Sequence, residues 1–123
     1  MTEPYLGRIE VSPRAIESIA GLAVLESYGV VGLAPKDSWT RERVHEYVAA
    51  LLPRASFRRG VDVKYQDNQV VIDLYVIIEY GTRISEVAVG IKNRVKYTVE
   101  RDTGLTVAQV NVHVQGLRVS NGA

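Results

Sequence analysis

The chain contains no cysteine, which excludes disulfide bonds, thiolate catalysis and cysteine-ligated zinc or iron centres. It also lacks any run of about 20 apolar residues, the length that a membrane-spanning helix needs. Its longest strongly apolar stretch, residues 70–78, is interrupted by Asp73. Because residues 1–10 show no basic segment followed by an apolar one, the sequence predicts no signal peptide. These absences favour a reducing compartment such as the cytoplasm.

An excess of charge of one sign is absent as well. Fifteen Lys and Arg residues balance fourteen Asp and Glu residues and leave a formal net charge of +1. A nucleic-acid-binding domain usually carries a basic excess or stripe, so we expect no nucleic acid as the main partner. The 123 residues are 46% hydrophobic and 24% charged, which is typical of a folded domain. We therefore expect a single domain over residues 1–123, with its core in about residues 7–119.

Motifs that carry chemistry are missing from the sequence. His45 and His113 are the only histidines, and neither has the spacing that places two metal ligands on one helix face. No G-x-S-x-G, Walker or G-x-G-x-x-G motif is present. Asp73 and Glu79 are too far apart along their strand to form an acid–base pair. The sequence therefore predicts no enzyme, no cofactor and no metal site.

The first half of the chain alternates short strand and helix patterns. Residues 7–11 have the two-residue periodicity of a half-buried strand. Ser12 and Pro13 have the character of a helix start, and we expect that helix to stop at Gly29. A short strand is expected at 30–34 and a second helix at 40–52, which Pro53 closes.

The second half has the clearest pattern. Residues 61–65 and 70–78 alternate in the manner of a β-hairpin around the polar turn 67–69. A helix follows over 84–102 with Gly104 as its stop, and a last strand covers 106–119 with a bulge or kink at Gly116. The predicted order is β-α-β-α-β-β-α-β. We expect an α+β fold with a mixed β-sheet and helices mainly on one face.

Two segments suggest binding of an anion or of RNA. Arginine side chains match phosphate geometry, so Arg54, Arg58 and Arg59 form a candidate anion-binding loop; a solvated loop is the plainer interpretation. The segment Gly29-Val30-Val31-Gly32 has the G-x-x-G spacing of a KH loop, which clamps an RNA backbone. Its middle residues are not basic and a strand follows it, so a turn and a strand explain it better.

Four segments of the sequence form a distinctive combination. They are Gly7-Arg8-Ile9-Glu10-Val11-Ser12, the helix from Ile16 to Ala23 running into Gly29-Val30-Val31-Gly32-Leu33, the strand Val71-Ile72-Asp73-Leu74-Tyr75-Val76-Ile77-Ile78-Glu79-Tyr80-Gly81, and the end Val110-Asn111-Val112-His113-Val114-Gln115-Gly116. Together they resemble the alkaline shock protein family of envelope stress response proteins. The resemblance extends from about Gly7 to Val119. The last two segments are the most specific, although neither is a catalytic motif.

The resemblance implies a cytoplasmic protein of mostly Gram-positive bacteria with a role in cell-envelope homeostasis. It further implies self-association as a homo-oligomer and recruitment to the inner face of the membrane by a membrane-anchored protein partner. It implies no enzymatic activity. The helical stretch 39–52 and the arginine loop depart from the family pattern in a region that varies among its members.

We expect one strand face to form the interaction surface, because half-apolar exposed strand faces are candidates for docking. This predicted surface consists of Tyr75, Ile77, Glu79, Asn111, His113 and Gln115. A small RNA-binding module is the second hypothesis, and an enzyme is the third.

Overall fold

The computed structural model describes residues 6–35 and 58–119, and this part of the chain forms two helices and four strands. In chain order they are α1 (Pro13–Leu25), β1 (Val30–Leu33), β2 (Val61–Gln66), β3 (Gln69–Glu79), α2 (Ile84–Thr103) and β4 (Thr106–Arg118). The predicted α+β class is confirmed. The predicted helix of residues 40–52 lies outside the described residues.

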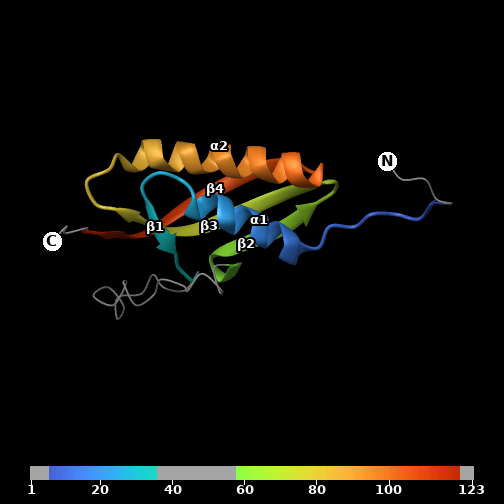
Figure 1. The fold of residues 1–123 in the computed structure, drawn as a ribbon, viewed down its shortest axis with the longest axis horizontal. Helices are drawn as coiled ribbons and strands as arrows, with labels where there is room; N and C mark the ends of the chain where they lie inside the picture. Colours follow the sequence, from blue (N-terminus) through green and yellow to red (C-terminus); the bar gives the residue numbers. More distant parts are fainter. Residues whose placement is uncertain (1–5, 36–57, 120–123) are drawn as a thin grey trace.

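The strand β3 is the centre of the sheet (Figure 1). Along one side it pairs antiparallel with β2 over its first half, where Val61 faces Leu74, and with β1 over its last residues, where Val30 faces Ile78. The strand β4 pairs parallel with β3 from Gln69 to Glu79, so it must occupy the other side. The sheet is therefore mixed, as the sequence predicted.

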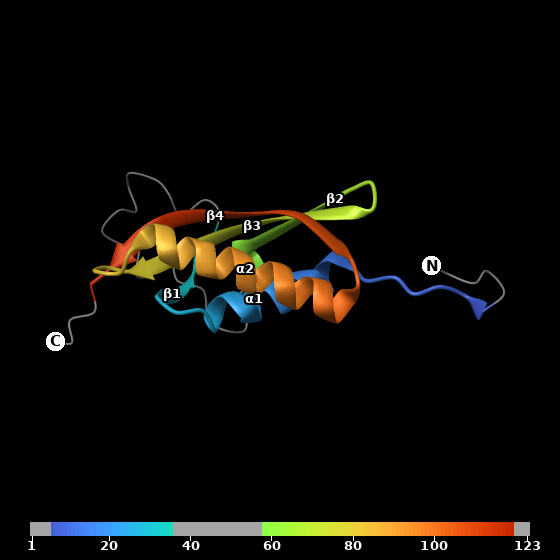
Figure 2. The same ribbon diagram turned by 90° about the horizontal axis from the view of Figure 1, so that it is seen from above.

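Both helices lie on one face of the sheet, as Figure 2 shows. Alternate residues of β3 point toward them and are fully buried in the core: Val70, Ile72, Leu74, Val76 and Ile78. The helices meet these residues with Ile16 and Ala20 of α1 and with Val87, Ile91, Val95 and Val99 of α2. Each fully buried Val or Ile contributes roughly 1.5–3 kcal/mol of transfer free energy, so this face contributes substantially to stability.

The helix ends follow local capping rules. The Ala15 backbone N–H donates to the Ser12 side chain at 3.1 Å, and Pro13 stands where its missing N–H costs nothing. Gly104 ends α2 in the left-handed conformation, with φ of 78°. Gly29, with φ of 86°, was predicted to stop α1, but α1 already ends at Leu25. Gly29 instead lies in the turn that enters β1.

The hairpin and the bulge form as predicted. Asp67 connects β2 to β3 with φ of 56°, a left-handed conformation that aspartate tolerates better than most residues. In β4 the register shifts between Val114 and Gly116, so Gln115 is the extra residue of a bulge. The bulge returns Leu117 to the core side, where it packs beside the helices.

Residues 7–11 form no strand, and this prediction was wrong. The segment has the right alternation but pairs with no strand in the described chain, and the Ile9 side chain is 90% exposed. The Tyr65 hydroxyl donates to the Val11 carbonyl at 2.6 Å and ties the end of the segment to β2. A segment with an alternating pattern forms a strand only when it can pair with the edge of another strand, because its backbone hydrogen bonds come from that partner. We call residues 6–11 the N-terminal arm.

Candidate functional site

The face of the sheet opposite the helices, here called the second face, carries aromatic and polar side chains. Asp73 and Tyr75 of β3 stand beside Asn111 and His113 of β4, their register partners. The His113 Nε2 lies 3.0 Å from Asp73 Oδ1, and the His113 ring stacks on the Tyr75 ring with centroids 4.6 Å apart. We call Asp73, Tyr75 and His113 the His113 cluster. Sequence reasoning had considered Asp73 only as a partner of Glu79.

The electrostatics of this cluster favour the protonated form of the Tyr75 hydroxyl. Burial raises the pKa of Tyr75 above its ordinary value, and the negative charges of Asp73 and Asp62 raise this pKa further, while Lys64 lowers it. The phenol therefore stays protonated and is a poor nucleophile at neutral pH. A carboxylate only accepts hydrogen bonds, so the contact with Asp73 assigns a proton to Nε2 of His113.

The cluster also lacks the neighbours that a metal would need. Within residues 6–35 and 58–119, no three His, Asp or Glu side chains group together as possible metal ligands. What remains is an imidazole fixed by a carboxylate on one side and by an aromatic ring on the other. This arrangement orients the His113 ring at the surface, where 44% of its side chain is exposed.

The predicted interaction surface is only partly accessible. Ile77 is fully buried and Tyr75 is 8% exposed, so the expectation that both are exposed is corrected. The sequence pattern assigned Tyr75 and Ile77 to the second face, but it could not show that their side chains are buried there. The other predicted residues reach the surface to different extents: Glu79, Asn111 and Gln115 partly, and His113 most. Whether they bind a partner stays a prediction.

The outer edge of β4 pairs with no other strand in the described part of the chain. At the start of β4, two side chains of α2 make the backbone hydrogen bonds that a neighbouring strand would otherwise make. The Val107 N–H donates to Glu100 Oε2 at 2.9 Å, and Lys96 Nζ donates to the Val107 carbonyl at 3.0 Å. The hydrogen bond from Val107 and the contact with Lys96 lower the pKa of Glu100. Protection of this kind is typical of edge strands.

A second candidate site is a groove of about 630 Å³ at the start of α1. It is lined by Ser12, Pro13, Arg14, Glu17, Arg58, Arg59 and Val61. The structure thus brings Arg58 and Arg59 together, while Arg54 lies outside the described residues. Sequence reasoning missed Arg14, whose only signal was its position at the helix start. We call these residues the arginine groove.

The KH-like interpretation is not supported by the fold. Val30, Val31 and Gly32 form β1 together with Leu33, and they pair with β3 near Ile77 and Ile78. A KH loop must leave its backbone free to contact RNA. In this chain the central residues of the motif are engaged in the sheet, so they cannot act as such a loop.

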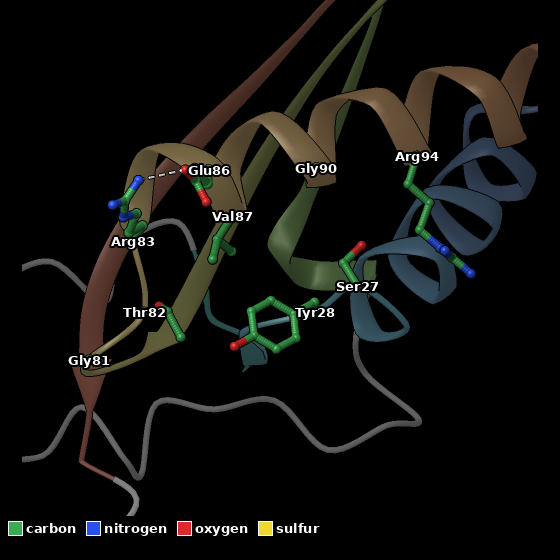
Figure 3. A pocket seen from close by; sticks show the side chains of 9 residues that line it. All are labelled: Ser27, Tyr28, Gly81, Thr82, Arg83, Glu86, Val87, Gly90 and Arg94. Carbon is green, nitrogen blue, oxygen red and sulfur yellow. Dashed lines mark hydrogen bonds and ion pairs between the residues drawn. The ribbon is translucent and has the colours of Figure 1, made fainter.

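A further cleft of about 530 Å³ lies where the start of α2 faces the turn after α1 (Figure 3). The Tyr28 ring projects into this opening and is 82% exposed. Both arginines of the cleft are paired: Arg83 with Glu86 at 2.9 Å and Arg94 with Glu26 at 3.2 Å. Because each positive charge is balanced locally, the cleft has no unpaired arginine among its described residues.

Comparison with known proteins connects this fold to a family. The profile of the alkaline shock protein 23 family, described as having a cell envelope-related function, matches residues 1–119. The chain is 42% identical over 115 residues to the Bacillus subtilis protein named "Uncharacterized protein YloU", covering 94% of this chain and 92% of that protein.

More relatives come from Streptococcus pyogenes. "Uncharacterized protein Spy1614" is 37% identical over 113 residues, which is 92% of this chain and 89% of that protein. A protein named "Stress response regulator gls24 homolog" is 29% identical over 124 residues, 96% of this chain but 63% of that protein. No solved structure matches the chain significantly. None of the described helices combines the length and apolar character needed to cross a membrane.

Proposed function

The chain belongs to the alkaline shock protein 23 family, and from this premise we propose that it is a non-catalytic assembly protein of the envelope stress response. In this role it associates with copies of itself and binds a membrane-anchored protein at the cytoplasmic face of the cell membrane. The family description and a relative named as a stress response regulator support the setting. The binding mode follows from the surface of β4.

The observation that carries the proposal is the long outer edge of β4. This strand has 13 residues; side chains of α2 bind its edge at Val107, and no described strand other than β3 pairs with it. An edge strand offers unpaired N–H and C=O groups to an incoming strand, which is a common mode of protein recognition. Asn111 and His113 stand beside this edge on the second face and are available to specify the partner.

The His113 cluster supports a binding role rather than chemistry. Its phenol is held protonated, and its imidazole is fixed between Asp73 and Tyr75. A ring held in one orientation loses little conformational entropy when a partner contacts it, and this favours recognition. The cluster is therefore suited to present one face of His113 to another protein.

The test adds charge to the second face of β4 and measures self-association. Gln109 and Asn111 both stand on this face and point away from the core. We expect the wild-type chain to sediment as an oligomer and the Gln109→Lys/Asn111→Lys variant to shift toward the monomer, because lysines on an edge strand oppose strand addition. The matched control is Ser85→Lys/Asn93→Lys, which adds the same charge to exposed positions of α2.

Circular dichroism establishes that each variant keeps its fold. A monomeric wild-type chain at the concentration found in the cell contradicts the proposal. An oligomer that both lysine variants leave unchanged contradicts the assignment to β4.

Membrane recruitment is tested in the native cell with a photo-crosslinking residue in place of Ala108, an exposed position of β4. We expect a crosslink to a protein with a membrane span, and we expect it to disappear when Gln109→Lys/Asn111→Lys is combined with the probe. Crosslinks that survive this combination, or that join only copies of the chain, contradict partner docking at β4.

A further inference from the structure

The arginine groove holds positive charge that the described chain does not balance. Arg14, Arg58 and Arg59 line it and form no ion pair within residues 6–35 and 58–119. Among the described residues of its lining, Glu17 is the only acidic one. The cleft at the start of α2 differs, because both of its arginines are paired. The groove is thus the place where three guanidinium groups remain available to an anion.

The N-terminal arm, which precedes the groove in the chain, carries exposed apolar side chains. The arm leads directly into Ser12, which lines the groove, and Figure 1 shows it extending away from the start of α1. Leu6 is 79% exposed and Ile9 is 90% exposed. Between them Arg8 is neutralised by Glu10 at 3.0 Å. Exposed aliphatic side chains on a segment that leads into a cationic groove are a combination suited to an anionic lipid surface.

We propose that the arginine groove and the N-terminal arm bind directly to anionic phospholipid. The guanidinium groups of Arg14, Arg58 and Arg59 bind headgroup phosphates, whose geometry they match in bidentate contacts. Leu6 and Ile9 enter the boundary between headgroups and acyl chains, where an apolar side chain gains by leaving water. This lipid contact goes beyond the proposed function, which recruits the chain through a protein.

The groove fits lipid better than RNA. A single-stranded RNA site combines cations with aromatic rings on which bases stack, and among the residues that the structure describes no aromatic side chain lines this groove. The neighbouring exposed side chains are aliphatic instead. The start of α1 adds little by itself, because Ser12 already occupies the Ala15 N–H. The three arginines therefore select a ligand with negative charge, and the arm selects a ligand with an apolar part.

The experiment is co-sedimentation of the full chain with vesicles. One set contains phosphatidylcholine alone, and in the other about a third of the lipid is phosphatidylglycerol, an anionic lipid. We expect binding to the anionic vesicles only, and we expect it to weaken as salt rises. Each arginine near such a surface contributes about fivefold in affinity, so Arg58→Ala/Arg59→Ala lowers binding by roughly 25-fold.

The matched control removes the same charge elsewhere. Lys92 of α2 and Arg118 at the end of β4 are exposed, and their side chains have no ion pair in the described chain. We expect Lys92→Ala/Arg118→Ala to bind vesicles like the wild type. Equal losses in the two double variants would mean that total charge, not the groove, governs binding, and the proposal would fall.

The arm is tested with Leu6→Ser/Ile9→Ser, which keeps every charge. We expect this variant to bind anionic vesicles several-fold more weakly and to bind inorganic phosphate as the wild type does. Phosphate binding that depends on Arg58 and Arg59, without any vesicle binding, would identify a soluble phosphate compound as the ligand and overturn the lipid assignment. Binding of single-stranded RNA in preference to vesicles would also overturn it.

These outcomes are separate from those of the proposed function. Purified vesicles contain no protein partner, so failure to bind them leaves the β4 docking proposal intact. Conversely, loss of self-association in Gln109→Lys/Asn111→Lys leaves the arginine groove unchanged.

Discussion

The two faces of β3 differ in how they are built, although both are buried near the centre of the strand. On the helix face, Ile72 and its neighbours meet only apolar side chains of α1 and α2. On the second face, Ile77 is as fully buried as Ile72, but it shares the face with Asp73, Tyr75 and His113. The comparison teaches that one strand can carry an apolar core on one side and a fixed polar cluster on the other. The helix face is thus wholly apolar, whereas the second face combines a buried apolar side chain with polar groups.

The largest expected effect compares Ile72→Ala with Ile77→Ala. Both side chains have the same chemistry and no exposed surface, so each substitution leaves a cavity. We expect each to lower the free energy of unfolding by about 3 kcal/mol, measured by urea denaturation. Val89→Ala, at a position that is 53% exposed on α2, is the control and should change stability by less than about 0.5 kcal/mol. A loss under about 1 kcal/mol for Ile77→Ala alone would show that the second face contributes little to the fold.

An intermediate effect is expected for His113→Ala. This change removes a ring stacked on Tyr75 and a hydrogen bond to Asp73, while leaving the apolar core untouched. We expect a loss of roughly 1 kcal/mol in the free energy of unfolding. Gln109→Ala, on the same face of the same strand, is the matched control. If the two substitutions cost the same, the cluster has no structural role and the distinction between the faces weakens.

The smallest effect is a pH dependence that belongs to the second face. Because the pKa of Tyr75 is raised in the folded protein, the unfolded chain loses this proton first as the pH increases. The contribution of Tyr75 to stability is therefore complete below its ordinary pKa of 10.0 and is lost as the pH rises through the raised value. Tyrosinate absorbance, compared with that of Tyr75→Phe, measures this ionisation.

Asp73→Asn sharpens that measurement. Burial is the largest cause of the raised pKa, and Asp73 is the next. We expect the variant to ionise Tyr75 at a lower pH than the wild type does, but still above the ordinary value. An ordinary pKa for Tyr75 in the wild type would mean that the phenol is not enclosed by the second face.

Local patterns predicted the elements whose signals lie within a few residues. Ser12 and Pro13 start α1, Gly104 ends α2, and Asp67 turns the hairpin, because each of these effects depends only on neighbouring backbone groups. The alternation over residues 70–78 also predicted a strand, which the structure shows as β3. The bulge at Gly116 was predicted from a glycine inside a strand pattern.

Predictions that needed a distant partner were less complete. The N-terminal arm has the alternation of a strand but pairs with no strand among the described residues. The G-x-x-G segment has the spacing of a loop, but its residues in β1 pair with β3. Among the candidate sites, Arg58 and Arg59 were predicted, while Arg14 joined them only when α1 folded beside Val61. No periodicity within one segment contains this information.

The amino-acid sequence by itself determined the family, the α+β class and the positions of most described elements. Only the tertiary structure decided that Ile77 is closed off, that Asp73 reaches His113 across 40 residues, and that three arginines share one groove. The physical reason is the separation along the chain over which each interaction acts. Capping, turns and amphipathic periodicity act between near neighbours, whereas burial and electrostatic potential at a point sum over every residue that folding brings there.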